Sequence, residues 1–260
     1  MTREESRAGA VTLVRSLRLS WIAAQQSFVR PQVRGETTLE SVYGLHIPRA
    51  LDEACDPQRL ALIVYDMQVG ILGQIKNGTE VTAKVVEVLH AARHAGVRVF
   101  FMRHMSLPNE LMGVFQFRMA MAWQRVSRPA DVKPWFLRDS PGFHLVPEVA
   151  PLPSEAVFDK ITMSAFEGTP LDIALRDCGI NAFVIVGVAT EVGIEPTVRH
   201  GADLGYIPIV VTDACGAGHQ EAGDRALASL RYTGDAILTD VAEISEALRG
   251  HAGRSRELSR

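Results

Sequence analysis

Short apolar runs recur along most of the chain, and each is followed by a segment with helical spacing. The first run, Leu60-Ala-Leu-Ile-Val-Tyr65, is continuous and closes at Asp66, which is typical of a strand buried on both faces. In residues 79–95 the apolar positions recur every three or four residues up to Gly96, which predicts a helix with a glycine at its C-terminal end. The same patterns predict further strands at 97–102, 156–158, 182–187, 207–212 and 236–238, and further helices at 109–125, 169–178, 191–204 and 220–231.

The alternation of strands and helices predicts the fold class. Strands joined by helices of 10–15 residues favour right-handed crossovers and a mostly parallel sheet covered on both sides. We therefore expect a Rossmann-like α/β protein with three layers, α-β-α, around six strands. Residues 127–154, rich in proline and aromatic side chains, are expected to form a loop. The predicted organisation is an N-terminal extension over 1–55, one domain over 56–249 and a polar tail over 250–260.

Composition narrows the class of function. The 260 residues include 27 Lys and Arg against 30 Asp and Glu, a net charge of −3, with 47% hydrophobic and 22% charged residues. This balance is typical of a soluble globular protein and argues against a nucleic-acid binder. Residues 11–29 are apolar in places, but their longest uncharged stretch, Leu19 to Val29, is too short and too polar to span a membrane, so we expect a helix that lies on the surface or contacts a partner. Three scattered cysteines suit a reducing cytoplasm.

Polar residues end several of the predicted strands. Because ligands of open parallel sheets bind beyond the carboxyl ends of the strands, these residues are the candidates for a site. They are Asp66 with Gln68, Arg103 with His104, Lys160, the segment 187–193 and the segment 213–219. No glycine-rich phosphate-binding motif follows the first strand or occurs elsewhere, so no nucleotide cofactor is expected.

Four blocks at these strand ends resemble one known family. The blocks LALIVYDMQ, VFDKITMSAFEGTPLDIALRDCGI, VIVGVATEVGIEPTVRHGADLGY and IPIVVTDACG are similar to the isochorismatase-like hydrolases, also called the cysteine hydrolase superfamily. The resemblance covers about residues 59–245 in order and spacing. It implies a six-stranded parallel sheet between helices and a hydrolase that needs no cofactor. It also implies three site residues, an Asp that matches Asp66, a Lys that matches Lys160, and a nucleophilic Cys.

The nucleophile is the departure, because the Cys position is occupied by Gly193. A covalent acyl-enzyme needs a thiolate there. The isochorismatases proper are similar to this family but have Gly in place of Cys, and they cleave a vinyl ether. A general acid protonates the terminal enol carbon, and water captures the resulting cation. By this resemblance Asp66 is the acid, Lys160 positions it or holds a substrate carboxylate, and vinyl-ether hydrolysis is the favoured reaction.

The resemblance also implies how the substrate is held. Gly193 is expected to leave room for the ligand, with the backbone N–H groups of Ala189 and Gly193 facing it. The Val188–Ala189 peptide bond is expected to be cis. Gln68, Arg103, His104 and Phe166 are the remaining candidates for substrate contact. No metal is expected, because the sequence RHMSLP lacks the histidine motif of the metal-binding members.

Two other functions stay open. If Asp66 is ionised, it can activate water against an amide or lactam, with the two N–H groups as an oxyanion hole. The segment 187–193 resembles the amidase branch apart from its glycine, which favours this alternative. The other reading is a catalytically inactive binding member of the family. Cys215 is expected to be a small buried residue rather than a substitute nucleophile.

The expected partners are a small-molecule substrate and further copies of the chain. The stripe of Met112, Phe115, Met119 and Trp123 is expected in the core or a subunit interface rather than in a substrate pocket. The resemblance implies oligomer formation, which is common in this family, and together with the apolar N-terminal segment it predicts a homo-oligomer, a dimer or tetramer. No nucleic acid or membrane partner is expected, and the predicted location is the cytoplasm.

Overall fold

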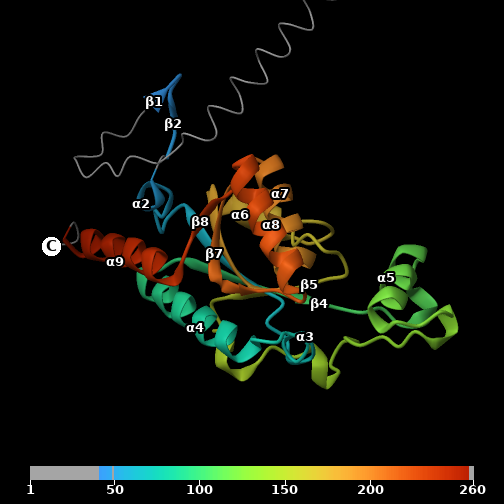
Figure 1. The fold of residues 1–260 in the computed structure, drawn as a ribbon. Helices are drawn as coiled ribbons and strands as arrows, with labels where there is room; N and C mark the ends of the chain where they lie inside the picture. The colour runs from blue at the N-terminus through green and yellow to red at the C-terminus, as the bar shows by residue number, and fades with distance from the viewer. Residues whose placement is uncertain (1–40, 49, 258–260) are drawn as a thin grey trace, which may run out of the picture. The chain divides into compact units, whose positions relative to one another are not determined.

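The computed structural model describes residues 41–257 apart from residue 49, and the expected helix within 11–29 lies outside this range. The described part begins with the short strands β1 (Ser41–Val42) and β2 (Leu45–His46) and helix α2 (Leu51–Ala54). The domain that follows is built on a single sheet (Figure 1). None of the described helices is long and apolar enough to cross a membrane.

Six parallel strands form this sheet, in the order β5-β4-β3-β6-β7-β8. The predicted fold class is therefore confirmed, and every predicted strand is present. The central strands are fully buried apolar runs, as their sequences predict for a sheet covered on both faces. The bounds are β3 (Leu60–Tyr65), β4 (Arg98–His104), β5 (Ala156–Lys160), β6 (Ala182–Val188), β7 (Ile207–Gly216) and β8 (Ile237–Thr239).

Two helical layers cover the sheet (Figure 1). Side chains alternate between faces along each strand, so that Leu62 and Val64 pack with one layer while Ile63 and Tyr65 pack with the other. The first layer consists of α4 (Gly78–Ala95) and α9 (Val241–Glu257). The second consists of α6 (Leu171–Asp177), α7 (Glu195–Asp203) and α8 (Gln220–Thr233).

Helix α4 ends as its sequence predicts. Gly96 has φ +75°, the left-handed conformation that favours glycine, and its N–H bonds to carbonyls of the last turn. Helix α9, by contrast, has no counterpart among the predicted helices. It continues to Glu257, into the segment expected to be a polar tail. Ile244 and Leu248 of α9 are buried against the sheet, so tertiary packing stabilises a helix whose sequence is mostly polar.

The segment between β4 and β5 departs most from the predicted pattern. The helix predicted at 109–125 is a short 3₁₀ turn at Asn109–Leu111 followed by α5 (Val114–Gln124). No residue of α5 is fully buried, and the helix extends away from the sheet in Figure 1. The stretch predicted as loop contains three further 3₁₀ turns, each of which starts at a proline, and returns the chain to β5.

The strand order fixes the position of a site. Strand β3 lies between β4 and β6, so the chain leaves β3 on one side of the sheet and returns on the other. A crevice opens beyond the carboxyl ends of the strands at such a switch point. Asp66, the short helix α3 (Val69–Leu72) and the turn after β6 all lie at this edge.

Candidate active site

Asp66 and Lys160 form a buried ion pair at the carboxyl edge of the sheet. Lys160 Nζ lies 2.8 Å from Asp66 Oδ2, and the side chains are 1% and 8% exposed. Lys160 Nζ also donates to the carbonyl oxygen of Thr162 at 3.3 Å. The structure therefore brings together the two residues that the sequence predicts to be catalytic, although they are far apart in the chain.

The register of the sheet explains why a lysine is needed. Lys160 pairs with His104 in the β4–β5 ladder, so it lies two strands away from the end of β3. Only a long side chain reaches across the end of β4 to Asp66. The preceding residue, Asp159, points to the opposite face and pairs with Arg103 at 2.8 Å and Arg138 at 3.2 Å.

Asp66 lies at a sharp change of chain direction. Its φ is +49°, a conformation that non-glycine residues rarely adopt and that Asp tolerates better than most. Its N–H donates to the carbonyl oxygen of Met102 at 3.0 Å, and its own carbonyl accepts from the N–H of Gln68 at 2.7 Å. Both ends of the turn are thus fixed, and unusual backbone geometry held in this way is common at functional sites.

Burial dominates the electrostatics of the pair. Removal from water raises the pKa of Asp66 to about 6, against the lowering effect of the Lys160 ammonium. Burial likewise lowers the pKa of Lys160, while Asp66 raises it. Asp66 Oδ1 is buried and makes no hydrogen bond. A carboxyl with a pKa near neutrality and an unpaired oxygen can both hold and release a proton.

His104 is a neutral neighbour of the pair. Burial, followed by the Lys160 ammonium, lowers the pKa of His104 to about 3. Its ring packs edge-on against Phe136, with 5.9 Å between ring centres. Neutral at physiological pH, His104 offers the cavity one donor or acceptor without adding a charge.

A cavity of about 390 Å³ opens in front of the pair. This volume lies in the range of small-molecule sites. Its polar lining includes Glu191 and His219 beside the ion pair, and most of the remaining wall is apolar. The full lining is Tyr65, Asp66, Ile71, Gln74, Ile75, His104, Trp123, Arg125, Trp135, Phe136, Lys160, Met163, Val188, Ala189, Glu191, Val192, Gly193, Gly218 and His219.

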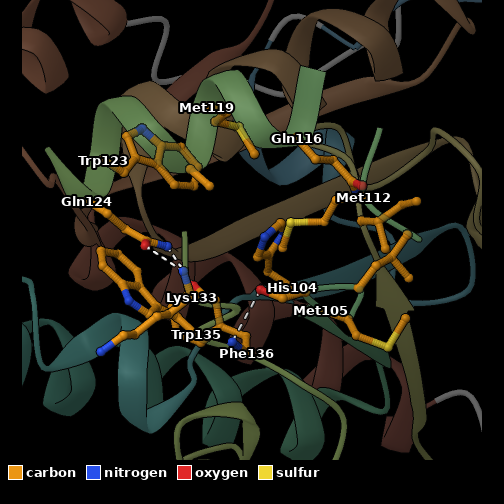
Figure 2. Close-up of a pocket in the computed structure, with 14 residues that line it drawn as sticks. His104, Met105, Met112, Gln116, Met119, Trp123, Gln124, Lys133, Trp135 and Phe136 are labelled. Carbon is orange, nitrogen blue, oxygen red and sulfur yellow. Dashed lines mark hydrogen bonds between the residues drawn. The ribbon is translucent and has the colours of Figure 1, made fainter. Parts of the chain in front are cut away.

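A smaller apolar pocket of about 40 Å³ adjoins this cavity, and His104, Trp123, Trp135 and Phe136 line both. Figure 2 shows Met119 and Trp123 of α5 facing Trp135 and Phe136 across it, with Met112, which precedes α5, beside His104. These three side chains are not fully buried in the core as expected, whereas their expected place in a subunit interface stays a prediction. Phe115, the fourth residue of the stripe, is 64% exposed.

The turn after β6 forms the opposite wall. The Val188–Ala189 peptide bond is cis, as predicted, and Ala189 and Gly193 both line the cavity. The Gly193 N–H, however, donates to the Ala189 carbonyl oxygen at 3.0 Å within a π-helical turn, Thr190–Ile194. Of the two N–H groups expected to face the ligand, the one of Gly193 is therefore already used within the turn. The space beside Gly193 is filled by Tyr65 rather than left to a ligand.

Gln68 does not reach the cavity. Its side chain is fully buried, and Nε2 donates to the carbonyl oxygens of His104 at 3.0 Å and Phe143 at 2.8 Å. Its Oε1 accepts from the His104 N–H at 2.6 Å. These three bonds use the amide as a brace between β4 and the loop that follows α5. Gln68 is therefore absent from the cavity lining, and its expected contact with substrate stays a prediction without support from this geometry.

Arg103 and Phe166 also lie outside the cavity. Arg103 precedes His104 in β4 and therefore points to the other face, where its guanidinium stacks on the Phe143 ring at 4.3 Å. Phe166 is buried in the core and stacks on Tyr206, with ring centres 5.5 Å apart. Ion pairing holds Arg103 and aromatic packing holds Phe166, so neither side chain lines the cavity, and their expected contact with substrate stays a prediction.

Cys215 lies within strand β7, paired with Gly187 of β6, and is not part of the cavity lining. Its Sγ approaches the Ile185 carbonyl oxygen at 3.7 Å, and burial raises the pKa of the thiol. It is thus a poor nucleophile, as the sequence predicts. Within the described part of the chain, no three His, Cys, Asp or Glu side chains gather as a group that could hold a metal ion.

Several cavity residues escape prediction from sequence. Tyr65 ends an apolar run and resembles a core residue, and Trp135 and Phe136 lie in a stretch without periodicity. Glu191 begins a helical turn and resembles a solvated residue. Its Oε1 accepts from the His219 N–H at 2.7 Å, whereas Oε2 is buried without a hydrogen bond. The only available signal is position, since Glu191 and His219 follow strand ends.

Comparison with known proteins agrees with the fold. The Isochorismatase domain model matches residues 60–243. The chain belongs to the isochorismatase family. The ureidoacrylate amidohydrolase RutB of Serratia proteamaculans (strain 568) is 33% identical over 188 residues, which cover 66% of this chain and 75% of that protein. This chain is therefore an isochorismatase-family hydrolase.

Solved structures give the same answer for the fold. A cysteine hydrolase from Pseudomonas syringae pv. phaseolicola 1448A superposes with a TM-score of 0.66 at 24% identity, over 76% of this chain and 96% of that one. An isochorismatase family protein from Burkholderia thailandensis gives 0.61 at 28% identity, over 74% and 96%. The matched region contains the whole six-stranded sheet and its carboxyl edge.

Proposed function

We propose that this hydrolase cleaves a vinyl ether in a small metabolite, as isochorismatases do, with Asp66 as the general acid. The observation that carries the proposal is the buried Asp66 carboxyl, paired with Lys160, whose pKa is raised to about 6 at the floor of a cavity without a lining thiol. A protonated carboxyl in an apolar cavity suits proton transfer to carbon. A cavity of about 390 Å³ suits a small cyclic substrate.

The proposed reaction needs only the carboxyl proton and one water. Protonated Asp66 gives its proton to the terminal CH₂ of the enol ether, which becomes a methyl group and leaves an oxocarbenium ion. Water adds to the cationic carbon of the oxocarbenium ion and returns a proton to the Asp66 carboxylate. The hemiketal then breaks its bond to the alcohol oxygen, its hydroxyl proton passes to that oxygen, and the products are pyruvate and the free alcohol.

Lys160 has two tasks in this scheme. Its ammonium fixes the orientation of Asp66 through the 2.8 Å contact with Oδ2, while Oδ1 keeps no hydrogen-bond partner. It also compensates the carboxylate that remains after proton transfer. The aromatic side chains of Trp123, Trp135 and Phe136 supply flat walls that suit an unsaturated ring.

Amide hydrolysis is the second candidate, because a relative with 33% identity is a ureidoacrylate amidohydrolase. In that case ionised Asp66 takes a proton from water, which attacks the carbonyl carbon directly. No thiol borders the cavity in the described residues, so this route is also non-covalent. Homo-oligomer formation and a cytoplasmic location remain predictions from the sequence.

The test is product formation from isochorismate and, separately, from ureidoacrylate and a panel of small amides. Pyruvate and ammonia are measured for the wild type, for Asp66→Asn and for Asp159→Asn. The last variant is a matched control, because Asp159 adjoins Lys160 but pairs with Arg103. Pyruvate release lost only in Asp66→Asn supports the proposal, and ammonia release with that dependence supports the second candidate. Equal turnover in Asp66→Asn overturns the site, and no turnover by the wild type favours a binding protein.

A further inference from the structure

At the wall of the cavity, the Tyr65 ring fills the space that a side chain at position 193 would need. Tyr65 is the last residue of β3, and its neighbour across the ladder is Gly187 at the end of β6. The turn after β6 brings Gly193 back over the tyrosine ring. A Cβ atom on Gly193 would overlap the Tyr65 hydroxyl and Cε1 and would lie 2.5 Å from Cζ.

The tyrosine ring cannot easily yield. Tyr65 is 1% exposed, belongs to the core face that packs under α6 and α7, and donates its hydroxyl hydrogen to the Met163 carbonyl oxygen. Lys160 Nζ lies 4.3 Å from the centre of its ring, the distance of a cation–π contact. The ring is therefore fixed by a hydrogen bond at one end and a charge on one face.

Tyr65 is not itself a substitute nucleophile. Burial, followed by the charge of Asp66, raises the pKa of the phenol, so the hydroxyl stays protonated. In addition, its hydrogen is committed to Met163. The Tyr65 ring thus fills the volume in which a side chain at position 193 would begin, but its hydroxyl does not act as a nucleophile in place of that side chain.

We infer that Tyr65 determines the reaction type of this enzyme, because its ring closes the position from which a nucleophilic side chain at 193 would reach the cavity. Tyr65 and Gly193 form a single steric unit: the glycine is required by the tyrosine, and the pair commits the cavity to direct attack by water. The chemical part of this inference rests on the proposed function, whereas the steric part stands alone and is tested without a substrate.

The first test is a double-mutant cycle on thermal stability. Gly193→Ala in the wild type should lower the melting temperature by about 5 °C or more, because the added methyl group overpacks a fixed ring. In a Tyr65→Leu background the same change should cost about 2 °C or less. If Gly193→Ala alone does not fold, recovery of folded protein in the double variant is the equivalent result. Equal losses in both backgrounds, or no recovery, overturn the inference.

The second test asks whether the opened position accepts a nucleophile. Gly193→Cys is made with and without Tyr65→Leu, both in a Cys178→Ser background, since Cys178 is exposed. p-Nitrophenyl acetate transfers its acetyl group to a thiolate and releases p-nitrophenolate, and peptide mapping locates the acetyl group. We expect acetylation at position 193 to be about ten-fold faster or more in the variant with Tyr65→Leu. Equal acetylation with Tyr65 in place overturns the inference, whatever the outcome of the substrate panel.

Discussion

Lys160 Nζ lies 2.8 Å from Asp66 Oδ2, and neither side chain has appreciable contact with water. A buried pair of this kind is weak evidence for stability, because the cost of removing two charges from water offsets most of their attraction. It is better evidence for function, since burial raises the pKa of Asp66 to about 6 and leaves one of its oxygens unpaired. The buried pair therefore explains how the Asp66 carboxyl can hold and transfer a proton near neutral pH.

Lys160→Met should destabilise the protein in a pH-dependent way. The folded-state pKa of Asp66 is already raised above its unfolded value, and loss of the ammonium raises it further. A group with a raised folded-state pKa contributes its stability at low pH and loses it as pH rises through that pKa. We expect the free energy of unfolding to fall by about 3 kcal/mol or more at about pH 8, and by less at about pH 5. Urea unfolding at the two pH values measures this.

The control for that experiment is Lys84→Met. Lys84 also pairs with an aspartate, Asp213, at 3.1 Å, but both side chains are more than one third exposed. A surface pair contributes about 0–1 kcal/mol, so little change is expected at either pH. A loss in Lys160→Met that is the same at both pH values would show that Asp66 does not carry the pH dependence.

Gln68→Ala should cost stability rather than substrate binding. The side chain makes three buried hydrogen bonds, to the backbone of His104 and Phe143, and their loss leaves buried backbone groups without partners. We expect the free energy of unfolding to fall by about 2–4 kcal/mol, with KM close to the wild-type value. Gln220→Ala, on the exposed side of α8, is the control and should change stability by less than about 0.5 kcal/mol. A large rise in KM with unchanged stability would return Gln68 to the binding site.

Cys215→Ala should leave kcat/KM close to the wild-type value. Its thiol has a raised pKa because it is buried, and it is not part of the cavity lining. Steady-state kinetics on whichever substrate is turned over measures this. A loss comparable to that of Asp66→Asn would show that a cysteine enters the reaction after all.

Much of the fold can be predicted from the sequence, because the patterns that indicate strands and helices are both local. Continuous apolar runs such as Leu60–Tyr65 give the strands, and helical spacing with Gly96 gives the boundary of α4. Helix α9 was missed because its sequence is mostly polar, and three buried apolar residues, Val241, Ile244 and Leu248, attach it to the sheet. Its stability comes from contacts that the local pattern does not contain.

The candidate site could be predicted in part for a similar reason. Asp66 and Lys160 follow strand ends, and the topology brings all strand ends to one edge. Arg103 and His104 are the last two residues of one strand, but alternation sends only one of them to the cavity, and the sequence does not say which. Gln68 reads as a ligand contact until its three backbone bonds are seen.

The relation between Tyr65 and Gly193 could not be predicted at all. A tyrosine at the end of an apolar run is typical of a core residue, and a glycine at a strand-to-helix turn is typical of a tight backbone approach. Only the fold brings the two residues, 128 positions apart, into one volume. The contribution of Trp135 and Phe136 to the cavity wall could not be predicted either, because the segment that carries them has no periodic pattern.

The most direct measurement is the pH dependence of kcat/KM between about pH 4.5 and 8.5, on the substrate that the wild type turns over. If Asp66 is the general acid, it must be protonated in the free enzyme, so kcat/KM should fall as pH rises through about 6, approaching ten-fold per pH unit. A profile that instead rises through about pH 6 would mean that the ionised carboxylate is the active form. That result would contradict the proposed function and favour hydrolysis by activated water.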